Sequence, residues 1–166
     1  KKLSAIMFTH LVEYDEYYKT DKKLANRLLK QHDKILGEII SSFNGRIVKH
    51  MENRIFAEFQ SATDSVKCSI AMHISLKKIN SQNPETFQMN IRVGIHMAEV
   101  YEKDGDLFGE GVNLAARIEP ISKYGATVTT QAIYNSIRSE KNIFIRDMGR
   151  VSLKNIKEPE RLFKVY

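Results

Sequence analysis

The segment GDLFGEGVNLAARIE holds the side chains with the clearest chemical potential. Asp106 precedes an aromatic residue, two glycines follow, and Asn113 and Arg117 stand four residues apart, which places both on one face of a helix. Residues four apart are neighbours on a helix surface, so the amide and the guanidinium lie together. A second notable side chain is His10, because it ends the apolar run Ala5–Phe8 where the chain turns toward solvent.

The composition fits one folded domain spanning residues 1–166. The chain is 42% hydrophobic and 28% charged, which supplies enough apolar side chains for a core. No repeat or domain boundary interrupts it, and no apolar run approaches the roughly 20 residues that cross a bilayer, so we expect no membrane contact by this domain. Because the first residue is Lys1 and no leader pattern follows, we expect a piece of a longer, multidomain protein.

The net charge and the cysteine content limit which binding partners and which cellular compartment we expect for this protein. The formal net charge is +6, but lysines and arginines are spread among 20 acidic residues without a platform of aromatic and basic side chains. We therefore expect a solvated surface that binds no nucleic acid. The single cysteine, Cys68, cannot form an internal disulfide, which fits a cytoplasmic setting, including the cytoplasmic part of a membrane-bound sensor.

Hydrophobic periodicity and turn residues predict the order of the elements. The expected series is a strand at 3–8, a polar loop at 13–22, a helix at 24–43, a hairpin at 45–60, a helix at 61–80, a long strand from 87 to the Asp104–Gly105 turn, a helix at 112–121, a strand at 126–130, a helix at 131–137, a strand around 144–146, and a closing pair through 151–156 and 161–166. This order predicts an α+β fold with a ferredoxin-like core, in which helices lie on one face of a mainly antiparallel sheet.

Five motifs, in order and at fitting separations, carry a resemblance to a known family. They are AIMFTHLV near the start, IVKHMENRIFAEF in the hairpin, IRVGIH in the long strand, GDLFGEGVNLAARIE, and LKNIKEP near the end. Together they resemble the class III adenylyl and guanylyl cyclase catalytic domain, also called the cyclase homology domain, over nearly the whole chain.

The resemblance implies a composite active site. In this family two domains pair head to tail and bind a nucleoside triphosphate between them, and two divalent ions assist attack of the ribose 3′-hydroxyl on the α-phosphate. Two aspartates hold the ions, one in a pattern like Phe-Thr-Asp-Ile-Val and one in a pattern like Lys-x-x-Gly-Asp. This chain has FTHLV and KHMEN instead, so His10 and Asn53 occupy the two metal positions.

The replacements predict loss of the usual metal chemistry. Mg²⁺ prefers carboxylate oxygens, and a neutral imidazole and amide remove two negative charges. We therefore expect the domain to bind no cofactor. It would use Mg²⁺ or Mn²⁺ only if it were catalytically active. His10 and Asn53 could instead hold a softer ion such as Mn²⁺ or Zn²⁺. The sequence shows no third ligand, although His50 lies near. Arg54 could supply positive charge in place of a metal, or be a solvated arginine at the hairpin tip.

Two neighbouring substitutions add carboxylates near the expected position of the triphosphate. Glu13 and Glu52 stand where the family often has glycine. We expect both carboxylates to repel a bound polyanion.

The rest of the family's machinery is matched in this sequence. Lys49 and Asp106 match the pair that reads adenine in adenylyl cyclases, and Asn113 and Arg117 match the residues that orient the ribose and stabilise the reacting phosphate. Lys154 matches a lysine that contacts the terminal phosphates. The alternatives are a Lys49–Asp106 salt bridge, ion pairs of Arg117 with Glu119 or Glu110, and surface charge at position 154.

These features together predict a catalytically silent cyclase homology domain that acts as a dimerising or nucleotide-sensing regulatory module. The expected partners are a second copy or another cyclase domain, and ATP or another purine nucleotide. The alternative is a nucleotidyl cyclase, converting ATP to cAMP and pyrophosphate, that is active as a heterodimer partner or with unusual metal ligation. A plain nucleic-acid binder has only the net charge in its favour.

Overall fold

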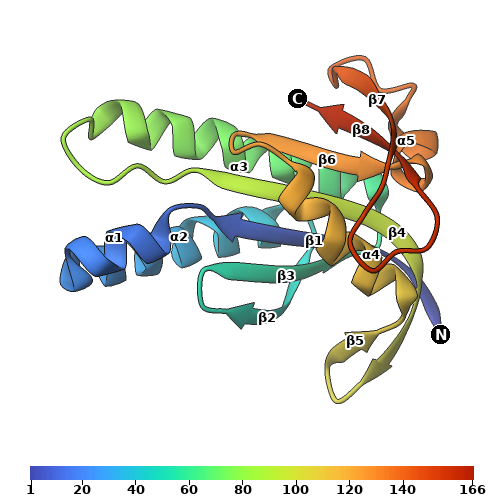
Figure 1. Ribbon diagram of the computed structural model, residues 1–166, viewed down its shortest axis with the longest axis horizontal. Helices are drawn as coiled ribbons and strands as arrows, with labels where there is room; N and C mark the ends of the chain where they lie inside the picture. Colours follow the sequence, from blue (N-terminus) through green and yellow to red (C-terminus); the bar gives the residue numbers. More distant parts are fainter.

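The computed structural model describes residues 1–166 as one sheet with helices on both faces (Figure 1). The strands are β1 (Lys2–Leu11), β2 (Arg46–Met51), β3 (Arg54–Phe59), β4 (Ile91–Lys103), β5 (Asp106–Phe108), β6 (Ala126–Thr130), β7 (Ile145–Val151) and β8 (Glu160–Val165). The helices are α1 (Tyr14–Thr20), α2 (Lys22–Ser42), α3 (Ala62–Gln82), α4 (Glu110–Ile118), α5 (Gln131–Ile137) and the 3₁₀ turn η1 (Glu119–Ile121). None of the helices is long and apolar enough to span a lipid bilayer.

The sheet has the strand order β2-β3-β1-β4-β6-β8-β7, and β5 pairs with the end of β4. Every neighbouring pair is antiparallel except β4 and β6. The mainly antiparallel α+β architecture predicted from the sequence is therefore confirmed. However, α4 and η1 lie on the face opposite to α2, α3 and α5, whereas the prediction placed the helices on one face. The β4–β5 hairpin extends beyond the body of the sheet (Figure 1).

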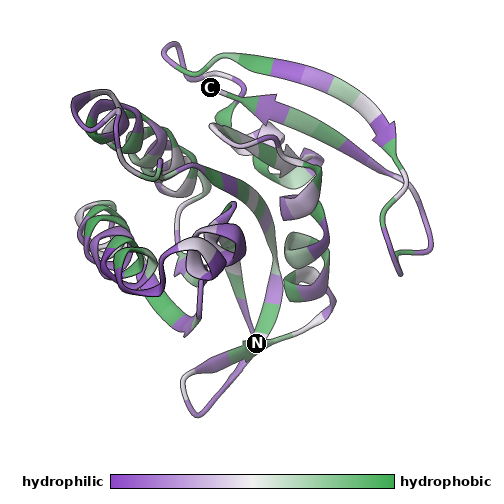
Figure 2. Ribbon diagram, turned by 60° about the vertical axis from the view of Figure 1, so that its left-hand side comes forward, coloured by the Kyte–Doolittle hydropathy of each residue, from purple (hydrophilic) through white to green (hydrophobic).

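Alternation along β1 divides the core between the two faces of the sheet. Ala5 and Met7 point to the face covered by α2, α3 and α5, where the largest cluster of buried side chains lies. Ile6 and Phe8 point to the opposite face, where a smaller cluster includes Ala115 of α4. Figure 2 looks roughly along the two long helices and shows them on one side of the sheet, with α4 on the other.

Two glycines let α4 and η1 lie directly on β4. A side chain at Gly111 would collide with Cβ of Ala98 on β4. A Cβ at Gly94 of β4 would lie 2.7 Å from the backbone nitrogen of Glu119 in η1. Since real Cβ atoms do not approach backbone so closely, glycine at these two positions sets how near Glu119 comes to the sheet.

The segment at 13–22 differs from the predicted polar loop, because most of it is helix α1. Tyr14 is buried, and Tyr17 stacks on Phe87 with ring centroids 4.2 Å apart. The segment has few apolar residues, and the aromatic residue that packs against its helix, Phe87, lies seventy residues away in the chain. The local sequence therefore gives little sign of the helix. Asp21 then caps α2 by accepting a hydrogen bond from the backbone nitrogen of Leu24.

The C-terminal pairing also differs from the prediction. The strand expected around 144–146 continues to Val151 as β7, and it pairs with β8 around an irregularity between Asp147 and Gly149. The segment expected to pair at 151–156 is instead a connection without regular structure beyond Val151. Leu153 in this connection is buried against Ile118 of α4, so its apolar character serves packing rather than a strand.

Stability should depend on pH through two histidines whose partners are threonines. Nε2 of His73 lies 3.0 Å from Oγ1 of Thr127, and Nδ1 of His96 lies 2.6 Å from Oγ1 of Thr130. Burial lowers the pKa of both histidines to about 4. Below about pH 6.5 the unfolded chain therefore binds protons that the folded chain does not, so protonation favours unfolding.

We predict that the free energy of unfolding is unaffected above about pH 6.5 and falls by about 2 to 3 kcal/mol per histidine as the pH drops to about 4. Urea denaturation across this pH range measures the slope. The double variant His73→Gln with His96→Gln should show a clearly flatter profile. Equal slopes for the two proteins would contradict this assignment.

Candidate functional site

Three cationic or titratable side chains lie in one row across three strands. In the strand register, His10 of β1 is opposite Arg54 of β3 on one side and Arg92 of β4 on the other. Directly opposed residues in antiparallel strands have Cβ atoms about 4.5–5.5 Å apart and point to the same face. His10 shares its face with Phe8, which is the face covered by α4 and η1. This Arg54–His10–Arg92 row therefore lies beneath η1.

The carboxylate of Glu119 in η1 meets this row and is only 1% exposed. Oε2 of Glu119 accepts a hydrogen bond from Nε of Arg92 at 3.0 Å, and Oε1 lies 3.7 Å from Nη1 of Arg54. The same Oε2 lies 3.8 Å from Nδ1 of His10. A buried carboxylate needs such partners, because an unpaired charge away from water costs several kcal/mol.

The contact with Arg92 fixes the hydrogen-bonding role of His10. Nη2 of Arg92 lies 2.6 Å from Nδ1 of His10. A guanidinium can only donate hydrogen bonds, so Nδ1 of His10 accepts, and the proton of the neutral ring is on Nε2. In this arrangement Nδ1 uses its lone pair on Arg92 and Nε2 carries a proton.

Asn53, at the tip of the β2–β3 hairpin, is 8% exposed and holds the hairpin to the end of β1. Its Nδ2 donates a hydrogen bond to the carbonyl oxygen of Leu11 at 3.0 Å. The backbone nitrogen of Leu11 donates to the carbonyl oxygen of Asn53 at 2.8 Å. The side chain of Asn53 thus has a structural role through its nitrogen, which leaves one neutral amide oxygen.

Lys49 and Asp106 meet within one chain, although 57 residues separate them. Nζ of Lys49 donates to Oδ2 of Asp106 at 2.9 Å and lies 6.0 Å from the ring centroid of Phe56. Hydrogen bonds from Lys49 and from the backbone nitrogen of Leu107 lower the pKa of Asp106. The salt bridge considered from the sequence therefore exists, and it brings one donor and one acceptor together at the surface.

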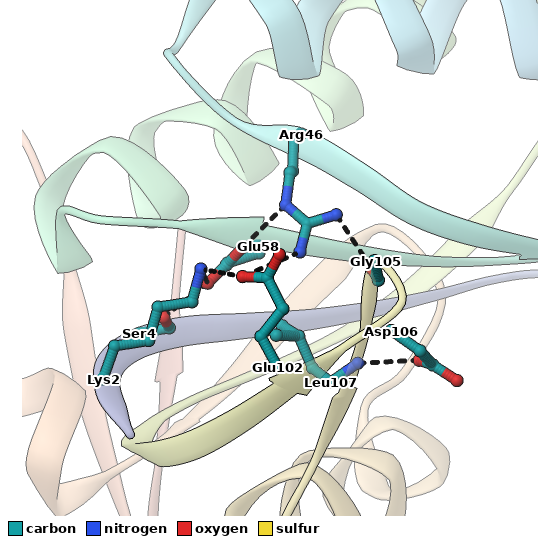
Figure 3. Close-up of polar contacts among 8 residues, drawn as sticks. All are labelled: Lys2, Ser4, Arg46, Glu58, Glu102, Gly105, Asp106 and Leu107. Atoms are coloured by element: carbon teal, nitrogen blue, oxygen red, sulfur yellow. Dashed lines mark hydrogen bonds and ion pairs between the residues drawn. The ribbon is translucent and has the colours of Figure 1, made fainter.

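A charge network centred on the buried carboxylate of Glu58 holds the turn that carries Asp106 (Figure 3). Glu58 of β3 accepts hydrogen bonds from Ser4 and from Nε of Arg46, and it pairs with Lys2. Burial opposes ionisation of Glu58, but these three partners outweigh it and lower its pKa. Nη1 of Arg46 then donates to the carbonyl oxygen of Gly105 at 3.1 Å. This network is a structural link from the sheet to the β4–β5 turn.

The side chains of Asn113 and Arg117 project from α4, and Arg117 forms no ion pair. Asn113 is exposed and lines a hollow of about 510 Å³ between α4, β8 and the connection at 155–158. Arg117 is half-buried, and neither Glu110 nor Glu119 lies within ion-pairing distance of it. Lys154 is exposed on the connection before β8 and likewise makes no ion pair. These three side chains are free to meet a ligand or a partner.

The comparisons with known proteins agree with this geometry. The family model described as the adenylate and guanylate cyclase catalytic domain matches residues 2–165. This chain belongs to that family. Among solved structures, the adenylate/guanylate cyclase/hydrolase from Silicibacter pomeroyi matches this cyclase domain with a TM-score of 0.86 and 26% identity, covering 99% of this chain and 96% of that one. The adenylyl cyclase CyaB from P. aeruginosa matches with a TM-score of 0.88 and 22% identity, covering 99% and 94%.

The relatives found by sequence are much longer than this cyclase domain. A protein of Rhizobium meliloti named "Putative adenylate cyclase 3" is 30% identical over 98% of this chain, which spans 28% of that protein. The serine/threonine-protein kinase pkn2 of Myxococcus xanthus is 28% identical over 83% of this chain, which spans 16% of it. This chain therefore corresponds to less than a third of the length of each of these two proteins.

The donor set at the metal position of the cyclase domain does not fit a pair of Mg²⁺ ions. Mg²⁺ takes octahedral oxygen ligands, usually including carboxylates. At the two positions that the resemblance assigns to the metal ligands, the only free side-chain oxygen is the amide oxygen of Asn53, and Arg54 follows it in the chain. His50 does not complete the set, because its Nδ1 lies 4.0 Å from Oδ1 of Asp33 on α2. No group of three or more His, Cys, Asp and Glu side chains could hold a metal ion.

Glu13 and Glu52, which the resemblance places where the family often has glycine, have a backbone conformation that favours glycine. Glu13 has φ 66° and Glu52 has φ 57°, which is the left-handed region. The carboxylate of Glu13 accepts a hydrogen bond from the hydroxyl of Tyr17 at 3.1 Å. Glu52 lines a hollow of about 560 Å³ with Tyr14 and Tyr18. The backbone geometry is therefore retained at both positions, while the side chains are engaged with α1.

Arg92 and Glu119 are functional candidates that sequence reasoning missed. Glu119 was considered only as a partner for Arg117, and Arg92 only as part of the IRVGIH motif. A charged residue between the apolar Ile91 and Val93 of a central strand was the available signal, since such a residue needs a buried partner. Its partner could not be named, because Glu119 is 27 residues away.

We predict that Glu119→Gln lowers the free energy of unfolding by about 1 to 3 kcal/mol, because it leaves Arg92 and Arg54 without their buried counter-charge. Chemical denaturation measures the change. Glu158→Gln, which removes an exposed carboxylate, is the matched control and should stay within about 0.5 kcal/mol of the wild type. Equal stability of the two variants would show that the Glu119 pairs contribute nothing.

Position 52 offers a second test, of backbone strain. We predict that Glu52→Gly is more stable than Glu52→Ala by about 1 kcal/mol, because only glycine adopts the left-handed region without cost. This order is the reverse of the one found at ordinary positions, where glycine loses to alanine. Thermal and urea unfolding of the two variants, which differ by one methyl group, measure the difference. An alanine variant as stable as the glycine variant would contradict the assigned backbone.

Proposed function

We propose that this domain is a regulatory member of the cyclase family that senses a purine nucleotide and does not form cyclic nucleotide by the two-metal route. The observation that carries the proposal is the state of the two metal positions. His10 is a neutral acceptor for Arg92, and Asn53 uses its amide nitrogen on Leu11. Loss of one preorganised electrostatic group costs about 10²- to 10³-fold in rate, and two such groups are replaced here.

The presence of the side chains that match the family's base-reading, ribose-binding and phosphate-binding residues supports nucleotide binding. Lys49 and Asp106 present one donor and one acceptor, which suits the N1 and exocyclic amine of adenine, so ATP is the preferred nucleotide. Asn113 and Arg117 are unpaired on α4 and would contact the ribose and the reacting phosphate, and Lys154 would contact the terminal phosphates. Their availability supports these roles, which follow from the family resemblance.

Pairing with a second cyclase domain is part of the proposal. A dimer is the arrangement that brings the base-reading pair of one domain opposite the phosphate-binding positions of another. Structural neighbours differ in this respect: a guanylyl cyclase domain from Blastocladiella emersonii is described as a non-canonical dimer, and adenylate cyclases from Trypanosoma brucei are described in their monomeric state. Sedimentation of this domain with and without ATP would establish which state it adopts.

A second candidate function is that of the silent half of an active heterodimer. The Lys49–Asp106 pair and the free Asn113 and Arg117 favour it, because such a subunit needs to supply only these groups. A partner that carries both metal aspartates but lacks the base-reading pair would complete one active site. Cyclic nucleotide formation that appears only on mixing the two proteins would favour this function over sensing alone.

We predict that the purified domain forms no cAMP or cGMP from ATP or GTP with Mg²⁺ or Mn²⁺. The double variant His10→Asp with Asn53→Asp restores two carboxylates and should gain metal-dependent nucleotide binding, because the anionic ligands for the cations return. Product analysis and calorimetric titration measure the two results. Clear cyclic nucleotide formation by the wild type would overturn the proposed function, and an unchanged affinity of the double variant would argue against a working pocket.

A further inference from the structure

The Arg54–His10–Arg92 row supplies fixed positive charge where the family binds metal ions. Arg54 and Arg92 each carry one positive charge, Glu119 carries one negative charge, and His10 is neutral in its role as acceptor for Arg92. The group is therefore left with one net positive charge. Two Mg²⁺ ions held by two aspartates would leave a positive excess at the same place. Within these four side chains the net charge is thus positive without metal, and the nearby carboxylate of Glu52 lies toward Tyr14 and Tyr18 of α1.

We propose that Arg54 binds the phosphate groups of a nucleoside triphosphate directly, in place of the family's metal ions, and that this binding needs no divalent ion. The inference rests on the proposed function, since it names how the same site would hold its nucleotide. It goes further in assigning the hairpin-tip arginine as a phosphate-binding group and in predicting that metal is dispensable for binding.

The arginines have donors to spare. Arg54 is 44% exposed, and its one ionic partner, Oε1 of Glu119, lies at 3.7 Å, which is beyond hydrogen-bond length. Arg92 is 27% exposed and uses Nε and Nη2, so Nη1 is free. His10 is 17% exposed and has a proton on Nε2 that no acceptor in the structure takes. A planar guanidinium matches phosphate oxygens in geometry as well as charge.

The depth of the charges determines which ones a ligand would meet. Glu119 is 1% exposed, whereas the two arginines beside it reach solvent. A phosphate group approaching the row therefore contacts the guanidinium groups, and the carboxylate stays behind them. Glu119 orients the arginines by holding Nε of Arg92 at 3.0 Å and Arg54 from the other oxygen. A solvated surface arginine would have no such fixed position.

The base-reading pair lies on the same face and next to the row. Phe8 and Phe56 stack with ring centroids 4.6 Å apart, two residue pairs along β1 and β3 from His10 and Arg54, and therefore on the same face. Lys49 lies over the Phe56 ring on the other side. The face thus presents a phosphate-binding row and a base-reading pair on adjacent strands, and a second domain would bring the complementary elements opposite each.

The test is calorimetric titration of the wild-type domain with sodium tripolyphosphate and with ATP, in EDTA and in excess Mg²⁺. We expect both ligands to bind in EDTA at least as tightly as in Mg²⁺, because Mg²⁺ neutralises part of the ligand's charge. Arg54→Ala should weaken tripolyphosphate binding in EDTA by about 10-fold or more, the effect of losing a charge-assisted contact. Arg150→Ala, which removes an exposed arginine from β7, should change it by less than about 2-fold.

Several results would overturn the inference. Binding that requires Mg²⁺, no binding of either ligand in EDTA, or equal affinities for the Arg54→Ala and Arg150→Ala variants would each do so. Arg54→Lys keeps the charge without the planar fork and should retain part of the affinity, which separates phosphate contact from loss of folding. Formation of cAMP by the wild type would refute the proposed function alone. The metal dependence of phosphate binding would still decide the inference.

Discussion

The carboxylate of Glu119 is almost completely removed from water, and its neutralisation determines how the centre of this face is built. Arg92 of β4 and Arg54 of β3 both form ion pairs with the Glu119 carboxylate. His10 of β1 lies between the two arginines and accepts a hydrogen bond from Arg92. The arrangement is possible because Gly94 lets η1 lie against β4. A buried charge with hydrogen-bonded partners is costly to break, so it holds three strands and η1 in a fixed relation.

This constraint ties the two positions that the resemblance assigns to metal ligands to the fold of the domain. Both side chains serve the protein's own structure: His10 accepts a hydrogen bond from Arg92, and Asn53 holds the hairpin to Leu11. Lys49 is likewise paired with Asp106, but at the surface and within reach of a ligand. In the part of this face around His10 and Asn53, the polar side chains form hydrogen bonds within the protein. In the other part, Lys49 and Asp106 lie at the surface, where a nucleotide could contact them.

Much of the fold was predictable because its signals are local. The two long helices show helical periodicity, the β2–β3 and β4–β5 hairpins have polar turns, and the order of elements implies the antiparallel sheet. Helix α1 and the course of β7 were not predictable. Tyr17 of α1 stacks on Phe87, and Leu153 after β7 is buried against Ile118, so in both places a distant partner decides the local structure.

The sequence by itself determined the family and which residue types stand at the positions where the resemblance expects metal ligands, a base-reading pair and phosphate contacts. It determined these because they depend on which residue stands at a position in a motif. Only the tertiary structure decided what the replacements do. That His10 is an acceptor for Arg92, and that Glu119 serves Arg92 and Arg54 rather than Arg117, follows from strand register and from the close approach of η1 to Gly94. Ion pairs and tautomers depend on distances of a few ångströms between residues far apart in the chain, which no local pattern encodes.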